Sequence, residues 1–365
     1  MKARLGVVLF GIGVFAVVIA AGLAFYVAPS VARLPYDLKL CTATVKQDCL
    51  QPSVAEAQNA HFLYTKGGDA PEVGIKTGTL RSTTEISPLP DTTDKELTGD
   101  LAGEAVVWRG LGTVVWTERN EMVSQYEALI ALDRDTAAGV DWKGQRLNDV
   151  AAPEVPDPVS YTGQLYKFPF GTERKNYEYF DRDLRKALPI QYKDTEKIDG
   201  LEVYRFEQVI PETTVNISQD RIASLIGTFA KTATSGEVKY SNTRTIWVEP
   251  VTGNFIKVSE QQRKTFVPDK GAPTELLNGD FVYTPDTVSH NVASAGETKR
   301  QIQLISLWVP IGLAVLGAIL LIVGPWMVTT GRKAARGRHE ELTGESDVPE
   351  GEAAEGEDED GRVTA

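Results

Sequence analysis

Two pairs of aspartates in residues 28–303 are spaced two positions apart, which places both side chains of a pair on one face of a β-strand. They are Asp133 with Asp135 and Asp181 with Asp183. Two carboxylates on one face could serve as the acid and the base of a glycoside hydrolase. Turn formation explains the first pair more simply, and Asp183 is suited to cap a helix over residues 184–188. We therefore interpret both pairs as structural and predict that the protein is not an enzyme.

Other side chains that commonly carry catalysis or bind metals are scarce. His61 and His290 are the only histidines in residues 28–303, and neither lies beside a serine or cysteine signature. The chain contains no Gly-x-Ser-x-Gly, no glycine-rich phosphate loop and no His-Glu-x-x-His. We expect neither a metal site nor a cofactor.

The two cysteines, Cys41 and Cys49, lie close together in the sequence. A metal site would need further ligands nearby, and the nearest histidine is His61. In an oxidising compartment the two thiols would form a disulfide that stabilises the fold by about 2–3 kcal/mol. We predict this disulfide, with two unpaired thiols as the alternative.

Aromatic and cationic residues are concentrated between residues 161 and 182. The rings that we single out are Tyr166, Phe168, Phe170, Tyr179 and Phe180, and the cations among them are Lys167, Arg174, Lys175 and Arg182. Core packing is the simpler interpretation of so many rings. The alternative is a ligand site in which the rings contact an acyl chain or a sugar and the cations bind phosphate.

One amphipathic helix is expected in the second half of the chain. Ile222, Leu225, Ile226 and Phe229 follow the i, i+3, i+4, i+7 pattern of one helix face. The helix would either fill the open side of a curved sheet as ordinary core or form the wall of an apolar cavity. These four residues join the five rings as candidate ligand-binding residues.

Two long apolar segments bracket the elements that would hold these residues. Residues 5–27 form a run of 23 and residues 304–328 a run of 25 without a charged side chain. A helix of this length spans about 35 Å, enough to cross a hydrocarbon core about 30 Å thick. Short flanks rich in lysine and arginine stay in the cytoplasm, so we predict a two-pass membrane protein with both termini inside. The flanking cations are Lys2, Arg4, Arg332, Lys333, Arg336 and Arg338.

A cleaved signal peptide is the alternative interpretation of the first apolar run. Its 23 residues exceed the usual hydrophobic region of about 7–15, which favours a retained anchor. The predicted organisation is a cytoplasmic N-terminus (1–4), a first span (5–27), an extracytoplasmic β-rich body (28–303), a second span (304–330) and a cytoplasmic tail (331–365). On the second span, Ala314 and Ala318 could pack against Ala16, Ala20 and Ala24 of the first.

The net charge of −12 is concentrated in the tail, because residues 340–365 hold eleven acids and one arginine. This segment has no aromatic residue and cannot bury enough surface to fold, so we predict disorder. The rest of the chain is nearly neutral and has no basic stripe. A nucleic-acid partner is therefore not expected.

The body has the composition of antiparallel strands separated by turns. The predicted fold is mainly β (α+β), a large curved antiparallel sheet with one solvent-exposed face. The predicted strands are 104–109, 113–118, 122–132, 164–168, 203–209, 238–248, 255–264 and 279–283. Residues 129–136 resemble residues 245–252 at an offset of 116, which suggests two pseudo-repeats (28–152 and 159–303) or a chance similarity of two hairpins.

Several motifs carry a family resemblance. Lys-Phe-Pro-Phe-Gly-Thr-Glu begins at Lys167, Tyr-x-Tyr-Phe-Asp begins at Tyr177, Gly-Leu-x-x-Tyr-Arg-Phe begins at Gly200, and Ile210 and Pro211 follow. From the first span to the second, the chain resembles an actinobacterial envelope family of PorA-like porins whose main domain has no known function. The resemblance implies an actinobacterial envelope protein, linked in mycolate-making relatives to lipoglycan assembly. It brings no catalytic residue with it.

A porin activity conflicts with these residues, because a pore needs a closed barrel with an apolar outer band or several helices around a lumen. Two helices per chain provide neither without oligomerisation. Residues 244–258 also resemble the Trp-Val-Asp-Pro-x-Thr-Gly hairpin of lipoprotein-sorting carriers, which wrap lipid between a concave sheet and helices. We therefore expect a membrane-anchored envelope protein that binds or hands on a lipid or lipoglycan. The alternatives are a scaffold subunit of an envelope glycosyltransferase complex, with envelope-biosynthesis proteins as partners, and an oligomeric porin-like channel.

Overall fold

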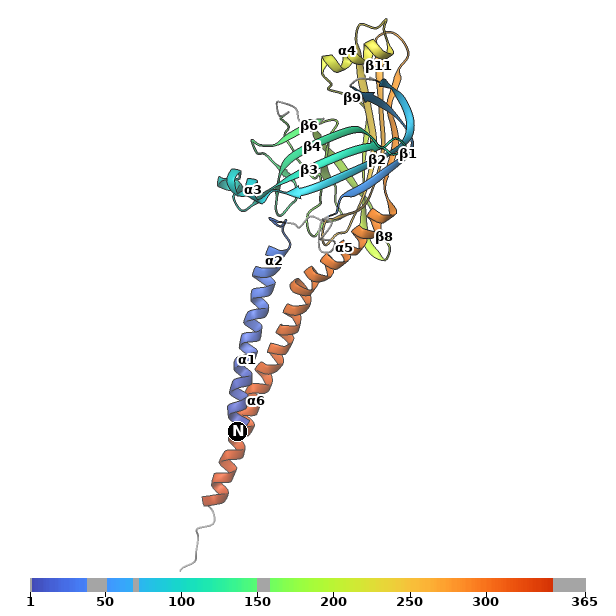
Figure 1. Cartoon of the computed structure of the whole chain (residues 1–365). Helices are drawn as coiled ribbons and strands as arrows, with labels where there is room; N and C mark the ends of the chain where they lie inside the picture. The colour runs from blue at the N-terminus through green and yellow to red at the C-terminus, as the bar shows by residue number, and fades with distance from the viewer. Residues whose placement is uncertain (1, 38–50, 68–71, 150–157, 344–365) are drawn as a thin grey trace, which may run out of the picture. The chain divides into compact units, whose positions relative to one another are not determined.

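The computed structural model describes residues 2–37, 51–67, 72–149 and 158–343 (Figure 1). Cys41 and Cys49 and most of the acidic tail lie outside the described residues. The chain divides into two compact units, one within Met1–Tyr26 and Ser306–Ala365 and the other within Val27–Ile305. The domain boundaries predicted from the sequence stay predictions, as does the extracytoplasmic placement of the body.

The first unit is built from the two terminal apolar helices. α1 (Lys2–Gly22) leads into the π-helical turn η1 (Leu23–Val27), and the π-helical turn η3 (Leu304–Trp308) leads into α6 (Val309–Thr343). Each apolar stretch is long enough to cross a membrane. Both runs predicted as spans are helical in the structure, as these bounds show.

Glycines bring α1 and α6 into close contact. A Cβ atom on Gly6 would lie 2.5 Å from the carbonyl oxygen of Gly324, and a Cβ atom on Gly13 would lie 3.0 Å from that of Gly317. The same approach holds in reverse, since a Cβ atom on Gly317 would lie 2.9 Å from the Gly13 oxygen. Only glycine allows two helix backbones to pack this closely. We call these four glycines the glycine seam.

The small-residue packing expected from the sequence is correct on one helix and wrong on the other. Ala16 and Ala20 of α1 are buried beside the glycine seam. Ala314 and Ala318 of α6 are exposed instead. The prediction is wrong for α6 because its glycines, rather than its alanines, occupy the face turned toward α1.

The second unit is a curled antiparallel sheet of the half-barrel type (Figure 1). The strands follow the order β5-β4-β3-β2-β1-β12-β11-β10-β9-β8-β7, and β6 pairs with β4. Neighbouring strands are mostly consecutive in sequence, and pairing of the first strand with the last joins the two halves. Their bounds are β1 Ser53–Lys66, β2 Glu72–Pro88, β3 Ala105–Trp116, β4 Glu121–Asp133, β5 Gly139–Val140, β6 Arg146–Asp149, β7 Tyr177–Asp181, β8 Lys186–Ile198, β9 Leu201–Val215, β10 Gly236–Val248, β11 Phe255–Pro268 and β12 Thr274–Tyr283.

Helices flank this sheet. α2 (Ala28–Val31) opens the unit, and α3 (Pro90–Glu96) and η2 (Gly99–Leu101) lie between β2 and β3. α4 (Gln219–Phe229) lies between β9 and β10, and α5 (Pro285–Gln303) follows β12. An ion pair of 3.0 Å between Lys299 of α5 and the buried Glu249 ties α5 to the turn after β10.

The segment of residues 161–164 bonds to both end strands of the sheet. The backbone N–H of Gly139 in β5 donates to the Gly163 carbonyl at 2.8 Å. The N–H of Gln164 donates to Glu178 of β7 at 2.7 Å, and the N–H of Phe180 donates back to Gln164 at 2.8 Å. The two edges of the curled sheet are thus linked through backbone hydrogen bonds, which leaves fewer unpaired groups at the sheet edges.

The predicted strands agree with the structure over β4, β9, β10, β11 and β12. Residues 104–109 and 113–118 were expected as two strands but belong to one, β3. Gly110 and Gly112 do not form a turn; they leave room for the side chains of Tyr166 and Tyr126, whose atoms lie 2.0 and 1.9 Å from the position of an added Cβ.

Two other local predictions are wrong. Residues 164–168 form no strand; only Gln164 makes an isolated bridge, to Tyr179. Residues 184–188 are a turn followed by the start of β8 rather than a helix. The turn forms because the N–H of Leu184 donates to the carboxylate of Asp181 at 3.0 Å, so an aspartate two positions before the expected cap sets the local geometry.

The resemblance between residues 129–136 and 245–252 extends to the geometry of their turns. The N–H of Asp133 donates to Ala138 at 2.9 Å, and at the offset of 116 the N–H of Glu249 donates to Asn254 at 3.0 Å. In both turns the fifth residue has a positive φ, 57° at Ala137 and 72° at Gly253. The two hairpins therefore share one local structure, while the division into repeats stays a prediction.

Candidate functional site

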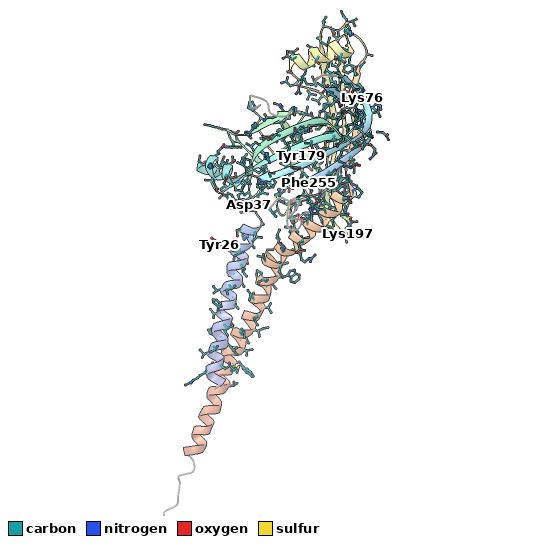
Figure 2. The ribbon with its side chains drawn as sticks, viewed as in Figure 1. Tyr26, Asp37, Lys76, Tyr179, Lys197 and Phe255 are labelled. Atoms are coloured by element: carbon teal, nitrogen blue, oxygen red, sulfur yellow. The ribbon has the colours of Figure 1, made fainter. Side chains whose placement is uncertain are left out.

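A cavity of about 300 Å³ lies within the curled sheet. Strands β1, β2, β3, β11 and β12 and helix α5 contribute to its walls. Its aromatic lining includes Tyr126, Tyr166, Tyr179, Phe180, Phe255 and Phe281. Figure 2 labels Tyr179 and Phe255, whose ring centroids lie 6.3 Å apart. A volume of this size is at the lower end of sites for small molecules, about 300–1,000 Å³.

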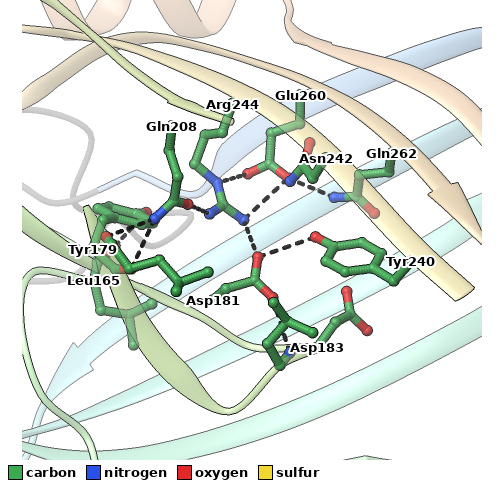
Figure 3. A network of polar contacts seen from close by, with 12 residues as sticks. Leu165, Tyr179, Asp181, Asp183, Gln208, Tyr240, Asn242, Arg244, Glu260 and Gln262 are labelled. Atoms are coloured by element: carbon green, nitrogen blue, oxygen red, sulfur yellow. Dashed lines mark hydrogen bonds and ion pairs between the residues drawn. The ribbon is translucent and has the colours of Figure 1, made fainter. Parts of the chain in front are cut away.

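A buried ionic network forms one wall of this cavity (Figure 3). Register places Arg244 of β10 opposite Gln208 of β9 and Glu260 of β11. The guanidinium of Arg244 donates to Glu260 at 2.7 Å, to Gln208 at 2.5 Å and to Asp181 at 3.2 Å. Tyr240 donates its hydroxyl proton to the same Asp181 at 3.0 Å. Buried charges require this degree of pairing because desolvation otherwise disfavours them.

The ionisation of Glu260 is set by two opposing effects. Burial raises the pKa of its carboxyl, and the charge and hydrogen bonds of Arg244 lower it by more, so that the net shift is downward. Asn242 and Gln262 also donate to this carboxylate, at 3.1 and 2.5 Å. Glu260 therefore stays an acceptor at neutral pH.

The acid pairs considered from the sequence have structural roles. Asp181 is part of the network around Arg244. Asp183 accepts a hydrogen bond of 2.6 Å from Lys264. Burial raises the pKa of Asp183, but the cation of Lys264 contributes to a net lowering. Asp133 and Asp135 do not line the cavity, and the first of them closes the turn after β4.

Three of the five predicted rings line the cavity, namely Tyr166, Tyr179 and Phe180. Phe168 is fully buried in core and contacts the ring of Phe206 at 4.7 Å between centroids. Phe170 is only partly buried and lies 4.2 Å below the ammonium of Lys167. A ligand site at these rings stays a prediction, and Tyr179 and Phe180 belong to buried core clusters as well as to the cavity lining.

The predicted helix residues lie elsewhere. Ile222 and Leu225 of α4 are buried against Val238 and Phe266, and Ile226 and Phe229 pack around them. None of the four lines the cavity of about 300 Å³. Their packing is that of ordinary core, which was the simpler of the two interpretations; Ile222 also lines a second, shallower hollow beside α4.

Lys167 supports the turn after β10 instead of a ligand. Its amine donates to the carbonyl of Thr252 and, at 2.6 Å, to the side chain of Asn254. Burial lowers the pKa of Lys167 to about 7, against the opposing effect of Glu249. A neutral amine still has two N–H donors, which match these two acceptors.

The sequence interpretation missed the ionic side of the cavity. Arg244 and Asn242 occupy inward positions of β10, between the buried Tyr240 and Ile246. Polar residues at inward positions of a strand with strict alternation are a signal that could have been used. Tyr126 and Phe281 had no such signal, because only the curling of the sheet brings β4 and β12 to one cavity.

No group of three metal-binding side chains occurs in the described ranges. His61 bonds to Glu275 at 2.9 Å, and His290 of α5 lines the cavity.

Taken together, the fold and the cavity define a β-rich chamber protein with two terminal helices apolar enough to cross a membrane. Residues 5–326 match the family model described as Porin PorA, and the chain belongs to this family. This confirms the resemblance noted in the sequence.

Two curated relatives carry the name Porin PorA. The protein of Corynebacterium resistens is 25% identical, over 92% of this chain and 99% of the relative. The protein of Corynebacterium amycolatum is 25% identical, over 76% of this chain and 82% of the relative. These names agree better with the channel hypothesis than with lipid transfer.

Proposed function

We propose that the β-rich body binds an amphiphile, such as a lipid or lipoglycan, in the cavity of the curled sheet. The supporting observation is the composition of the cavity wall. Tyr166, Phe180 and Phe255 present apolar rings, whereas Arg244 and Glu260 present charge to the same cavity. An amphiphile has the same division between an apolar chain and a polar head.

The terminal helices favour a location at the membrane for this activity. Their length and apolar composition suit two membrane spans. Cationic residues before the first span and after the second span favour a cytoplasmic location for both termini. The body would then work at the outer face of the membrane, where lipids and lipoglycan precursors are within reach.

Filling the cavity tests the proposal. Ser82 of β2 lines the cavity, whereas Ser124 of β4 is exposed and does not line the cavity. The full-length chain, purified in a neutral detergent, should carry a lipid in native mass spectrometry. Ser82→Trp should lose this lipid, and Ser124→Trp should keep it. A wild-type chain that is always empty, or a Ser82→Trp variant that carries the same lipid, contradicts the proposal.

A second candidate is an oligomeric channel, supported by the names of the relatives. The sheet itself is unsuited to lipid contact, because ion pairs such as Arg81 with Glu56 and Arg205 with Asp194 lie on partly exposed strand faces. A pore would therefore need helices from several copies. Stepwise conductance of the purified chain in planar bilayers would support the channel, and the absence of conductance at high protein content would contradict it. A scaffold role in a glycosyltransferase complex stays a prediction, for which co-purification of an enzyme is the test.

A further inference from the structure

We infer that Arg182 is an anion-recognition residue, and that the ligand of the cavity carries a phosphate or comparable anionic oxygen group. This inference rests on the proposed function, because it specifies the polar end of the ligand. It begins with the position of Arg182, which follows β7 and lines the cavity. The side chain is partly buried, and its guanidinium carbon lies 4.0 Å from the centre of the Tyr126 ring.

The other cations near this wall have carboxylate partners. Arg244 bonds to both Glu260 and Asp181, and Lys264 bonds to Asp183. Arg182 differs, since no residue in the described part of the chain accepts a hydrogen bond from it or forms an ion pair with it. Asp183 lies close enough to act on its charge, but the hydrogen bond of that carboxylate goes to Lys264.

An arginine in this state has unused binding capacity. The guanidinium has five N–H donors in a planar fork, which matches the oxygens of phosphate or carboxylate in a two-point contact. The cation–π contact with Tyr126 restrains the guanidinium without using these donors. Burial disfavours the charge of Arg182, but Asp183, Tyr126 and Asp149 raise its pKa, so that it is a cation at every physiological pH.

The rest of the cavity suits the remainder of such a ligand. Tyr126 contacts Arg182, and Tyr166 and Phe180 also line the cavity, so these rings offer apolar surface to the rest of the ligand. His290 of α5 also lines the cavity, and its ring forms no hydrogen bond with another described residue. It offers a second hydrogen-bonding group to the polar part of the ligand.

The test compares two lipids that differ only in the anion. Dihexanoylphosphatidic acid carries a phosphate, and dihexanoylglycerol has the same acyl chains without it. Titration calorimetry on the full-length chain in neutral detergent should show tighter binding of the phosphatidic acid by about tenfold or more, the usual effect of charge-assisted hydrogen bonds. Arg182→Gln should reduce this ratio to near one. Arg182→Lys should retain part of it, because the charge remains and the fork is lost.

Arg109→Gln is the matched control. Arg109 lies in β3, is exposed, and is next to Gly110, which faces Tyr166; alternation along the strand therefore puts it on the opposite face. This variant should keep the wild-type ratio. Arg182→Gln should also melt within about 2 °C of the wild type, because an arginine without a partner contributes little to stability. A wild-type ratio in Arg182→Gln would overturn the inference, and so would a large drop in its melting temperature together with equal loss of binding for both lipids, which would assign a structural role.

The outcomes separate the two proposals. Equal binding of both lipids to the wild type overturns the anion site and leaves the amphiphile function standing. Arg182-dependent binding of inorganic phosphate alone, without either lipid, supports the anion site with a free anion as its source and contradicts the amphiphile function. No binding of any of the three probes contradicts both.

Discussion

Arg244 makes the wall of the cavity a specific structure rather than a general polar surface. Its three acceptors come from β9, from β11 and from the end of β7. Gln208 and Glu260 lie directly opposite Arg244 in the neighbouring strands, whereas Asp181 lies three strands away in the sheet order, so this contact depends on the curl of the sheet. Replacing one member of a buried charge network leaves another charge unpaired, which is more costly than the pair is stabilising.

Glu260→Gln should lower the free energy of unfolding by about 3 kcal/mol at neutral pH, the lower end of the cost of breaking a buried pair. Because the folded-state pKa of Glu260 lies below its ordinary value, its contribution is present in full above about pH 4.5 and is lost as the pH falls through the folded-state value. The melting temperature of the full-length chain, measured between pH 6 and pH 3, should therefore depend less on pH in the variant than in the wild type.

Glu178→Gln serves as its control. Glu178 is exposed on β7, and surface substitutions of this kind change stability by about 0.5 kcal/mol or less. An equal loss of stability in both variants would show that the ionic network does not account for the effect.

At the scale of elements, turns and helix pairs depend on glycines in two different ways. Gly253 has a positive φ of 72°, and a Cβ atom there would lie 2.1 Å from the carbonyl oxygen of Phe168. Gly171 has almost the same φ, 67°, with open space around it. Comparing Gly253 with Gly171 therefore separates the effect of the positive φ from the effect of close backbone contact.

Gly253→Ala should destabilise the body by several kcal/mol more than Gly171→Ala. The left-handed conformation costs each variant about 1–2 kcal/mol, and only Gly253 adds a clash with backbone. Urea unfolding of the two full-length variants, followed by tryptophan fluorescence, measures the difference. Equal midpoints would mean that the segment before Gly171 moves freely away from the turn.

The glycine seam makes a similar comparison possible in the helix pair. Gly317→Leu should separate α1 from α6, because a Cβ atom alone would lie 2.9 Å from the Gly13 oxygen. Overpacking of this kind costs about 1–3 kcal/mol or shifts the backbone. Spin labels at Phe15 and Leu316, which are exposed, should report a longer interhelical distance. Gly312→Leu, with no atom within 4 Å of its Cβ position, should leave the distance unchanged.

On the scale of the whole molecule, the body is one sheet although its sequence shows two similar hairpins. β1 pairs with β12, and residues 161–164 bond to both β5 and β7. Contacts that are distant in sequence therefore hold the body together at two places. In the sequence, each end of this body continues into one of the two apolar helices.

Epitope tags test the predicted two-pass arrangement. Tags at both termini should resist external protease in intact spheroplasts and be digested after permeabilisation. A tag inserted at residues 269–271, an exposed turn after β11, should be digested in both. Loss of the N-terminal tag from the mature chain would instead indicate a cleaved signal peptide.

Local periodicity accounts for what could be read correctly before the structure. β10 alternates strictly and α4 shows one apolar face, so both were expected at nearly the right residues, whereas only parts of β9 and β12 were predicted. β8 was missed because Lys186, Gln191 and Lys193 make it polar, and its stability comes from pairing with β9. Family motifs located Tyr179 and Phe180, but they did not distinguish cavity from core.

The sequence by itself determined the two apolar helices, several of the antiparallel strands between them and, through its motifs, the membership of the porin family; β1 and β2 were not predicted. The helices and strands follow from composition and short-range periodicity, which act over a few residues. Only the tertiary structure decided that Tyr126, Arg182 and Arg244 meet at one cavity and that glycines form the helix seam. Strand curl and register set such contacts, and they depend on pairing between residues far apart in the chain.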